Sequence, residues 1–212
     1  MKVGFLFDMD GVVVDNLSYH VEAWLLFCQG KGIPLSRAVF FQTLNGMNSK
    51  DTFEWLYRRP MAADEIAELE EEKEAIYRGF YADHRQAAPG LMDFLASAKA
   101  KGIPMALATS AGAGNIDFIL DGLGIRSYFQ VIVGGHEVQK GKPDPEIYLK
   151  AAQKLGLNPS DCWVFEDSLQ GIKSGQAAGC RVVGITTTHD EKELSHTQIQ
   201  SPNFINLLDK IC

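Results

Sequence analysis

Two aspartates, Asp8 and Asp10, come directly after the first apolar run of the chain, and Gly11 follows them. The run, residues 3–7, has the length and composition of a buried strand. In open α/β sheets, ligands bind outside the carboxyl ends of the strands. Two carboxylates at such an edge repel each other unless they share a cation, and Mg²⁺ prefers oxygen ligands. The alternative is a plain turn, because Asp and Gly are both common turn residues.

Hydroxyl groups stand at the end of a second apolar run. Thr109 and Ser110 follow residues 104–108, and the small residues 111–114 come next. A hydroxyl and free backbone N–H groups at this position can hold a phosphate, and the dipole of a helix starting here would favour an anion. The alternative reading is a simple helix N-cap, and both can be true together.

A lysine and a second pair of acids complete the set. Lys142 lies in the Gly-Lys-Pro-Asp-Pro segment 141–145, where two prolines restrict the backbone. A positioned ammonium can offset the charge of a carboxylate beside a phosphate, although a lysine before proline can equally be a surface residue. Glu166 and Asp167 end the apolar run 163–165. They repeat the arrangement of the first two aspartates and predict the second half of a metal site.

The elements that would position these residues form an alternating pattern. Helical segments separate most of the short apolar runs, and this alternation predicts a parallel sheet covered on both faces. The expected fold class is α/β, a doubly wound, Rossmann-like sheet. The runs expected as strands are residues 3–7, 104–108, 131–133, 163–165 and 182–185.

One segment interrupts the alternation. Residues 8–103 separate the first two expected strands, far more than a crossover needs. Within them, residues 19–30 are apolar at helical spacing, and residues 65–81 are rich in Glu, Ala and Leu. We therefore expect an inserted helical cap. The predicted division is a core of residues 1–15 and 87–212 and a cap of residues 16–86.

The cap also contains aromatic and acidic residues whose roles need an interpretation. We interpret the acidic run at residues 70–72 as a solvated helix face. We expect four cap aromatics to form its hydrophobic core; they are Trp24, Phe27, Phe53 and Trp55.

Composition excludes several classes of function. The 212 residues carry 20 basic and 27 acidic side chains, a net charge of −7. An acidic chain is poorly suited to nucleic acid, which is held by Lys and Arg, and to an anionic membrane. The cysteines have no metal-binding or redox spacing, so a reducing, cytoplasmic location is expected. They are Cys28, Cys162, Cys180 and Cys212, of which Cys162 and Cys180 are expected to be core thiols.

The four motifs in this order, D-M-D-G, T-S, K-P-D-P and E-D, resemble those of the haloacid dehalogenase-like (HAD) superfamily over the whole chain. The helical insert after the first motif resembles the subgroup that contains β-phosphoglucomutase and small-metabolite phosphatases. The resemblance implies Mg²⁺-dependent phosphoryl transfer through an aspartyl-phosphate. Its implied partner is a small phosphorylated metabolite, handled by a monomer or small homo-oligomer.

The resemblance also implies a role for each motif residue. Asp8 corresponds to the nucleophile, and Asp10 to the acid and base that serves the leaving oxygen and the incoming water or hydroxyl. Thr109 and Lys142 match phosphate-holding positions, beside Ser110. The metal set combines Asp8, the Asp10 main-chain carbonyl, Asp167 and Glu166, the last directly or through water. Asp10 argues against the dehalogenases of the superfamily, which need neither a metal nor a second aspartate.

The cap residues bear on the choice between hydrolase and mutase. His20 resembles the cap histidine of the mutases, and Lys73 stands where those caps have a substrate-binding lysine. Both can equally be ordinary helix residues, Lys73 as an exposed one. The mutases place an arginine near the position of Ser49 to clamp a second phosphate, and here only Lys50, a point charge, is near. The sequence favours a phosphatase of small, sugar-like phosphates, with a sugar-phosphate mutase as the alternative and a non-catalytic phosphometabolite-binding module as a third.

Overall fold

The computed structural model describes residues 3–45 and 47–211. The chain divides into two compact units, one of residues 1–15 with 85–212 and one of residues 16–84. Within the described residues, no helix is both long and apolar enough to cross a membrane.

The first unit is built on a six-stranded sheet in the order β3-β2-β1-β4-β5-β6. Every neighbouring pair is parallel, so the predicted α/β class is confirmed. The strands are β1 (Gly4–Phe7), β2 (Met105–Ala108), β3 (Val131–Val133), β4 (Cys162–Glu166), β5 (Arg181–Ile185) and β6 (Ile199–Ser201). The sixth strand, at the edge of the sheet, was not predicted. It has only three residues, Ile-Gln-Ser, and most of them are polar.

Strand β1 lies between β2 and β4, and its register fixes which residues meet at the carboxyl edge. Phe7 is opposite Leu107 on one side and Phe165 on the other. The residues that follow these three positions therefore emerge side by side. This is the point where the chain order of the strands reverses, which is where open α/β sheets bind ligands.

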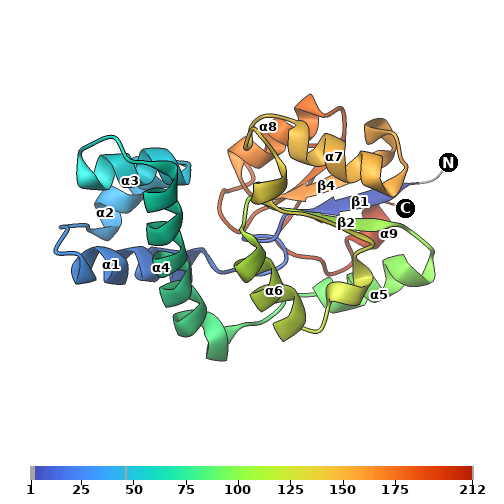
Figure 1. Cartoon of the computed structure of the whole chain (residues 1–212). Coiled ribbons are helices and arrows are strands. Elements are labelled where there is room, and N and C mark those ends of the chain that lie inside the picture. Colours follow the sequence, from blue (N-terminus) through green and yellow to red (C-terminus); the bar gives the residue numbers. More distant parts are fainter. Residues whose placement is uncertain (1–2, 46, 212) are drawn as a thin grey trace. The chain divides into compact units, whose positions relative to one another are not determined.

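Helices cover both faces of this sheet (Figure 1), with α7 and α8 on one side and α5 and α6 on the other. The helices of this unit are α5 (Leu91–Ala100), α6 (Ala113–Gly122), α7 (Glu146–Leu155), α8 (Leu169–Ala177) and α9 (Leu208–Ile211), with 3₁₀ turns η3 (Arg126–Tyr128), η4 (Gly135–Glu137) and η5 (Pro159–Asp161).

The two faces of the sheet have different cores. On one face Phe7 stacks on Phe165 with ring centroids 4.6 Å apart, and Phe94 from α5 meets Phe7 edge-on at 6.0 Å. On the other face Leu6 packs in a cluster with Tyr148 of α7. Because neighbouring β1 residues point to opposite faces, a fully apolar strand is needed, and the first polar residue can appear only where the strand ends.

The second unit is helical, as expected for the inserted segment. Its elements are α1 (Leu17–Gly30), α2 (Arg37–Val39), a π-helical turn η1 (Phe40–Leu44), α3 (Ser49–Tyr57), α4 (Ala63–Tyr81) and η2 (Ala82–His84). Helices α1 and α4 are joined at one end by a buried hydrogen bond from Asn16 Nδ2 to Tyr77 Oη, 2.6 Å long.

The core of the second unit includes Phe27 and Phe53, with Trp24 packed against it. The expectation that Trp55 joins this core was wrong, because its side chain is 42% exposed. Trp55 comes two residues after the buried Phe53, and residues two apart in a helix do not share a face.

Three cysteines, Cys28, Cys162 and Cys180, are buried free thiols. Burial raises the pKa of Cys28 and Cys162 to about 11 and that of Cys180 to about 12. A thiol that stays protonated is a poor nucleophile, so Cys162 and Cys180 are core thiols as predicted. Cys212 lies outside the described residues.

Candidate active site

Three buried acids meet where β1 and β4 end. Asp8 follows the last residue of β1, Glu166 is the last residue of β4, and Asp167 follows it. Each of the three offers a carboxylate oxygen within 4.8 Å of the others. The parallel register of β1 and β4 places them at one edge, since Phe7 and Phe165 are paired.

Lys142 neutralises part of this charge. Its Nζ lies 2.9 Å from Asp8 Oδ1 and 2.6 Å from Glu166 Oε1, and it also donates to the Ala108 carbonyl at 3.3 Å. The ammonium is therefore held between two carboxylates and the end of β2. The Lys142 side chain is only 7% exposed, so the surface-lysine reading is wrong. The peptide bond between Lys142 and Pro143 is cis.

Glu166 is held by donors on both oxygens. Oε1 accepts from Lys142 Nζ at 2.6 Å and from Tyr148 Oη at 2.7 Å. Oε2 accepts from the Asp167 and Ser168 N–H groups, both at 3.2 Å, and from Ser168 Oγ at 3.0 Å. A carboxylate has about four lone-pair sites, so these five bonds leave little room for direct contact with an ion. The geometry favours Glu166 as an anchor for Lys142.

Tyr148 is a further member of this network, and it lies outside the four sequence motifs. Its side chain is completely buried, its hydroxyl donates to Glu166, and Lys142 Nζ stands 5.0 Å from its ring centroid. Burial, followed by the charge of Glu166, raises the pKa of the Tyr148 hydroxyl well above its usual value. It therefore remains a donor across the physiological range. In the sequence, the only indication that Tyr148 belongs to this network was its position on an amphipathic helix, six residues after Lys142.

Asp167 lies close to Gly11 and accepts a hydrogen bond from the segment after β5. Gly11 has φ +76°, and a Cβ there would collide with the Asp167 carboxylate. Thr187 Oγ1 donates to the Gly11 carbonyl at 2.5 Å, and Thr188 Oγ1 donates to Asp167 Oδ2. The two neighbouring threonines therefore link the two acidic motifs, because Thr187 bonds to the first and Thr188 to the second. No sequence pattern marked them, because they lie outside the four motifs.

Burial and neighbouring negative charge raise the pKa values of Asp8 and Asp167. Burial raises the pKa of Asp8 to about 7; Lys142 opposes this shift, while Glu166 and Asp10 add to it. Burial, Glu166 and Asp8 likewise raise the pKa of Asp167 well above its usual range. These are carboxylates that one nearby lysine does not fully neutralise. A hard divalent cation such as Mg²⁺ would relieve the repulsion, and the all-oxygen donor set of Asp8 and Asp167 fits it.

The other predicted core residues stand around this group. Asp10 is half-buried, and its charge acts on Asp8, but its carboxylate is not part of the three-acid group. Thr109 is buried after β2, where its Oγ1 accepts from the Ala111 N–H at 3.1 Å. Ser110 is exposed. Helix α6 begins at Ala113, so a helix N-terminus follows Thr109, as expected.

The predicted cap residues belong to the second unit and differ in how deeply they are buried. Lys73 is buried, with Nζ 2.9 Å from His20 Nδ1 and 2.8 Å from Glu74 Oε1. The reading of Lys73 as an exposed helix lysine is wrong, whereas Lys50 is exposed in the first turn of α3. Of the acidic run 70–72, the last two residues are exposed but Glu70 is half-buried. The loop 44–50 contains Gly46, which lies outside the described residues.

Comparison with known proteins agrees with this geometry. The chain matches the haloacid dehalogenase-like hydrolase family over residues 3–179. Hexitol phosphatase A of Escherichia coli (strain K12) is 31% identical over 201 residues, covering 92% of this chain and 88% of that protein. A β-phosphoglucomutase from Clostridium difficile has a similar structure, with a TM-score of 0.85, 26% identity and coverage of 100% of this chain and 96% of that chain.

A longer relative also matches. The chloroplastic 5-amino-6-(5-phospho-D-ribitylamino)uracil phosphatase of Arabidopsis thaliana is 26% identical over 198 residues, which are 93% of this chain and 53% of the relative. The chain thus spans about half the length of that protein. Because the family match extends from β1 to the end of α8 and includes all four motifs, the chain belongs to the haloacid dehalogenase-like hydrolases.

Proposed function

We propose that the protein is a Mg²⁺-dependent phosphatase that hydrolyses small phosphorylated metabolites through an aspartyl-phosphate on Asp8. The observation that carries the proposal is the group at the end of β1, where Asp8 contacts Lys142 at 2.9 Å and lies with Asp167 in one buried acidic cluster. The phosphatase names of similar proteins, including a hexitol phosphatase, support small polyol or sugar phosphates as the substrate class.

In the first half-reaction, a carboxylate oxygen of Asp8 attacks the phosphorus of the ester. The Asp8–phosphorus bond forms as the bond to the leaving oxygen breaks, and Asp10, as the acid, gives its proton to that oxygen. Lys142 contacts Asp8 Oδ1, so its ammonium lies directly beside the attacking carboxylate. Thr109, at the start of the turn that leads to α6, would hold a phosphate oxygen, with Ser110 beside it.

In the second half-reaction, Asp10, now a carboxylate, takes a proton from water, and the water oxygen attacks the phosphorus. The Asp8–phosphorus bond breaks, releasing inorganic phosphate and restoring the Asp8 carboxylate. Lys142 serves both halves by stabilising the charge of Asp8 and of the phosphoryl oxygens.

Asp8 and Asp167 would hold the metal ion, with the Asp10 carbonyl as a third oxygen donor. When bound, Mg²⁺ supplies positive charge that screens Asp8 from the phosphate and polarises the phosphoryl group. The raised pKa of Asp8, about 7, supports this assignment. A nucleophile must be ionised, and a cation beside Asp8 would lower its pKa.

A sugar-phosphate mutase is the second candidate, favoured by the similarity to a β-phosphoglucomutase. The two activities share the core chemistry and differ in what accepts the phosphoryl group. A mutase must bind a second phosphate tightly and exclude water from the phosphoenzyme. Ser49 stands near the place where the mutases have an arginine, so we propose that water is the acceptor.

A metabolite phosphatase screen with Mg²⁺ tests the proposal. We expect release of inorganic phosphate from several sugar or polyol monophosphates, and none after chelation with EDTA. β-Glucose 1-phosphate with a trace of the 1,6-bisphosphate separates the two candidates. Rapid formation of glucose 6-phosphate with little free phosphate would establish the mutase, and full activity after exhaustive chelation would contradict the metal assignment.

A further inference from the structure

The segment that follows strand β5 contacts both acidic motifs of the catalytic edge. It begins with three consecutive threonines, residues 186–188. The Thr186 N–H donates to the Ser201 carbonyl at 3.0 Å, which extends the pairing of β5 with β6 by one hydrogen bond. Thr187 Oγ1 donates to the Gly11 carbonyl at 2.5 Å. The segment is therefore fixed both by its backbone and by a side chain.

Thr188, the third of these threonines, brings a hydroxyl to a buried carboxylate. Its Oγ1 donates to Asp167 Oδ2. Because Asp167 is only 5% exposed, this bond forms where little water competes for the carboxylate. The same oxygen lies against the backbone of Gly11, where an added Cβ would stand 2.0 Å from Oδ2. Contact with Gly11 and the bond from Thr188 together set the orientation of the Asp167 side chain.

The three acids of the catalytic edge are oriented by partners of different charge. Asp8 is held by the Lys142 ammonium, 2.9 Å from Oδ1. Glu166 accepts five hydrogen bonds, one of them from the same ammonium. Thr188 acts on Asp167 as a neutral donor. A hydroxyl orients a carboxylate without offsetting its charge, so the full charge of Asp167 stays available to a cation.

We propose that Thr188 is a positioning residue that holds Asp167 in the orientation that Mg²⁺ requires, and that it thereby makes the site prefer Mg²⁺ to Ca²⁺. The inference rests on the proposed function, because it takes Asp167 as a ligand of the metal ion. Mg²⁺ requires nearly ideal octahedral geometry, whereas Ca²⁺ accepts a variable number of oxygens in flexible arrangements. Loosening one carboxylate should therefore weaken Mg²⁺ binding more than Ca²⁺ binding.

The test measures metal affinity without turnover. Titrations of the full chain with MgCl₂ and with CaCl₂ at pH 8, each followed by Tm, give a Kd for each ion. Thr188→Val keeps the shape of the side chain and removes the hydroxyl. Partners that orient metal ligands contribute about 10–100-fold to affinity, so the Kd for Mg²⁺ should rise at least about tenfold. The Kd for Ca²⁺ should rise less than about threefold, because its geometry is flexible.

The size of the expected signal follows from the affinity. A tenfold loss is about 1.4 kcal/mol. At Mg²⁺ concentrations far above both Kd values, this loss lowers the Mg²⁺-induced rise in Tm by roughly 3–6 °C in a chain of this size. Thr188→Ser keeps the hydroxyl and should recover most of the Mg²⁺ affinity, which a role confined to packing of the threonine methyl group would not explain.

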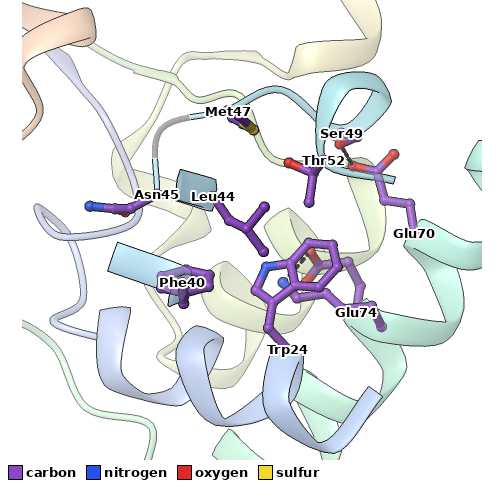
Figure 2. Close-up of a pocket in the computed structure, with 10 residues that line it drawn as sticks. Trp24, Phe40, Leu44, Asn45, Met47, Ser49, Thr52, Glu70 and Glu74 are labelled. Carbon is purple, nitrogen blue, oxygen red and sulfur yellow. Dashed lines mark hydrogen bonds and ion pairs between the residues drawn. The ribbon is translucent and has the colours of Figure 1, made fainter. Parts of the chain in front are cut away.

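Two control variants lose a hydroxyl elsewhere. Thr197→Val makes the same substitution in the same unit, where Oγ1 bonds to the Leu194 and Ile199 carbonyls at 2.9 and 3.0 Å. Ser49→Ala removes a hydroxyl-to-carboxylate bond, from Ser49 Oγ to Glu70 Oε1 at 2.5 Å, at the wall of a cavity within the second unit (Figure 2). Neither bond involves an acid of the catalytic edge, so both variants should keep the wild-type Kd for Mg²⁺ within about twofold.

The outcomes separate this inference from the proposed function. An unchanged Kd for Mg²⁺ in Thr188→Val, or an equal loss for both ions, would overturn the inference, and so would an equal loss in Thr197→Val. If Thr188→Val does not fold, Thr188→Ala, which also lacks the hydroxyl, takes its place with the same expected result. A wild type whose Tm rises with Mg²⁺ while the variants match it rejects only the role of Thr188. A wild type that does not respond to Mg²⁺ rejects the metal site itself.

Discussion

Replacing Tyr148 with Phe should weaken both the fold and the reaction, although Tyr148 touches no substrate in the proposed mechanism. The change removes one oxygen atom and keeps the ring under Lys142 Nζ, 5.0 Å from its centroid. What is lost is the 2.7 Å hydrogen bond to Glu166 Oε1. The variant therefore isolates the anchoring of Glu166 from the packing of helix α7.

The magnitude follows from the charge of the acceptor. A hydrogen bond to a charged group contributes about 1.5–3 kcal/mol to stability. In a chain of this size, that loss corresponds to a fall in Tm of roughly 3–12 °C. Glu166 Oε1 would then keep only the hydrogen bond from Lys142, and it would pull the Lys142 ammonium away from Asp8. A misplaced group beside the nucleophile costs rate rather than binding, so kcat should fall about tenfold while KM changes less than about twofold.

The assay pairs denaturant unfolding with steady-state hydrolysis of p-nitrophenyl phosphate at saturating Mg²⁺. A matched control is Tyr128→Phe, since Lys99 Nζ stands 5.1 Å from that ring centroid without a catalytic carboxylate beside it. We expect the control to retain wild-type kcat. If Tyr148→Phe keeps both its unfolding free energy and its kcat, Glu166 does not depend on Tyr148 and the anchoring argument is refuted.

Two further predictions concern the acids. Asp10→Asn should slow formation and breakdown of the phosphoenzyme, each about 10²–10⁴-fold, as rapid-quench trapping would measure; two unchanged half-reactions would remove Asp10 from the mechanism. Without metal, the raised pKa values of Asp8 and Asp167 mean that the folded state binds more protons than the unfolded state. Its stability should therefore fall as pH rises from about 4 to 7. Mg²⁺ competes with those protons, so the rise in Tm on adding Mg²⁺ should be small at pH 5 and larger at pH 8; an equal rise at both pH values would contradict the assignment.

The catalytic edge of the sheet was predictable because strand ends are where the sequence changes abruptly. Residues 3–7 are wholly apolar and Asp8 is not, and a parallel sheet brings such transitions to one edge. Asp8, Glu166 and Asp167 could therefore be expected at one edge from their positions at strand ends, whereas Lys142 joined them through the resemblance of its K-P-D-P motif. Strand β6 could not be predicted, since three residues of mixed polarity carry no periodic signal.

The network behind the motifs was not predictable, because it depends on tertiary contact. Tyr148 looks like any core aromatic of an amphipathic helix, and Thr188 like any loop residue. Only the fold shows that one donates to Glu166 and the other to Asp167. In the second unit, Lys73 looked like an exposed helix lysine until its contacts with His20 and Glu74 were seen. Burial of a charged side chain follows from its partners, which sequence spacing does not give.

In the proposed mechanism, Asp8 carries the phosphoryl group during turnover. The direct measurement is mass spectrometry of peptides from enzyme quenched in acid during steady-state turnover of a phosphate ester with Mg²⁺. We expect a phosphoryl group on Asp8 that disappears when the ester is exhausted. We also expect that folded Asp8→Asn shows no such group and loses several orders of magnitude in kcat. An active wild type with no phosphoryl group on Asp8, or a folded Asp8→Asn protein with substantial activity, would contradict this mechanism.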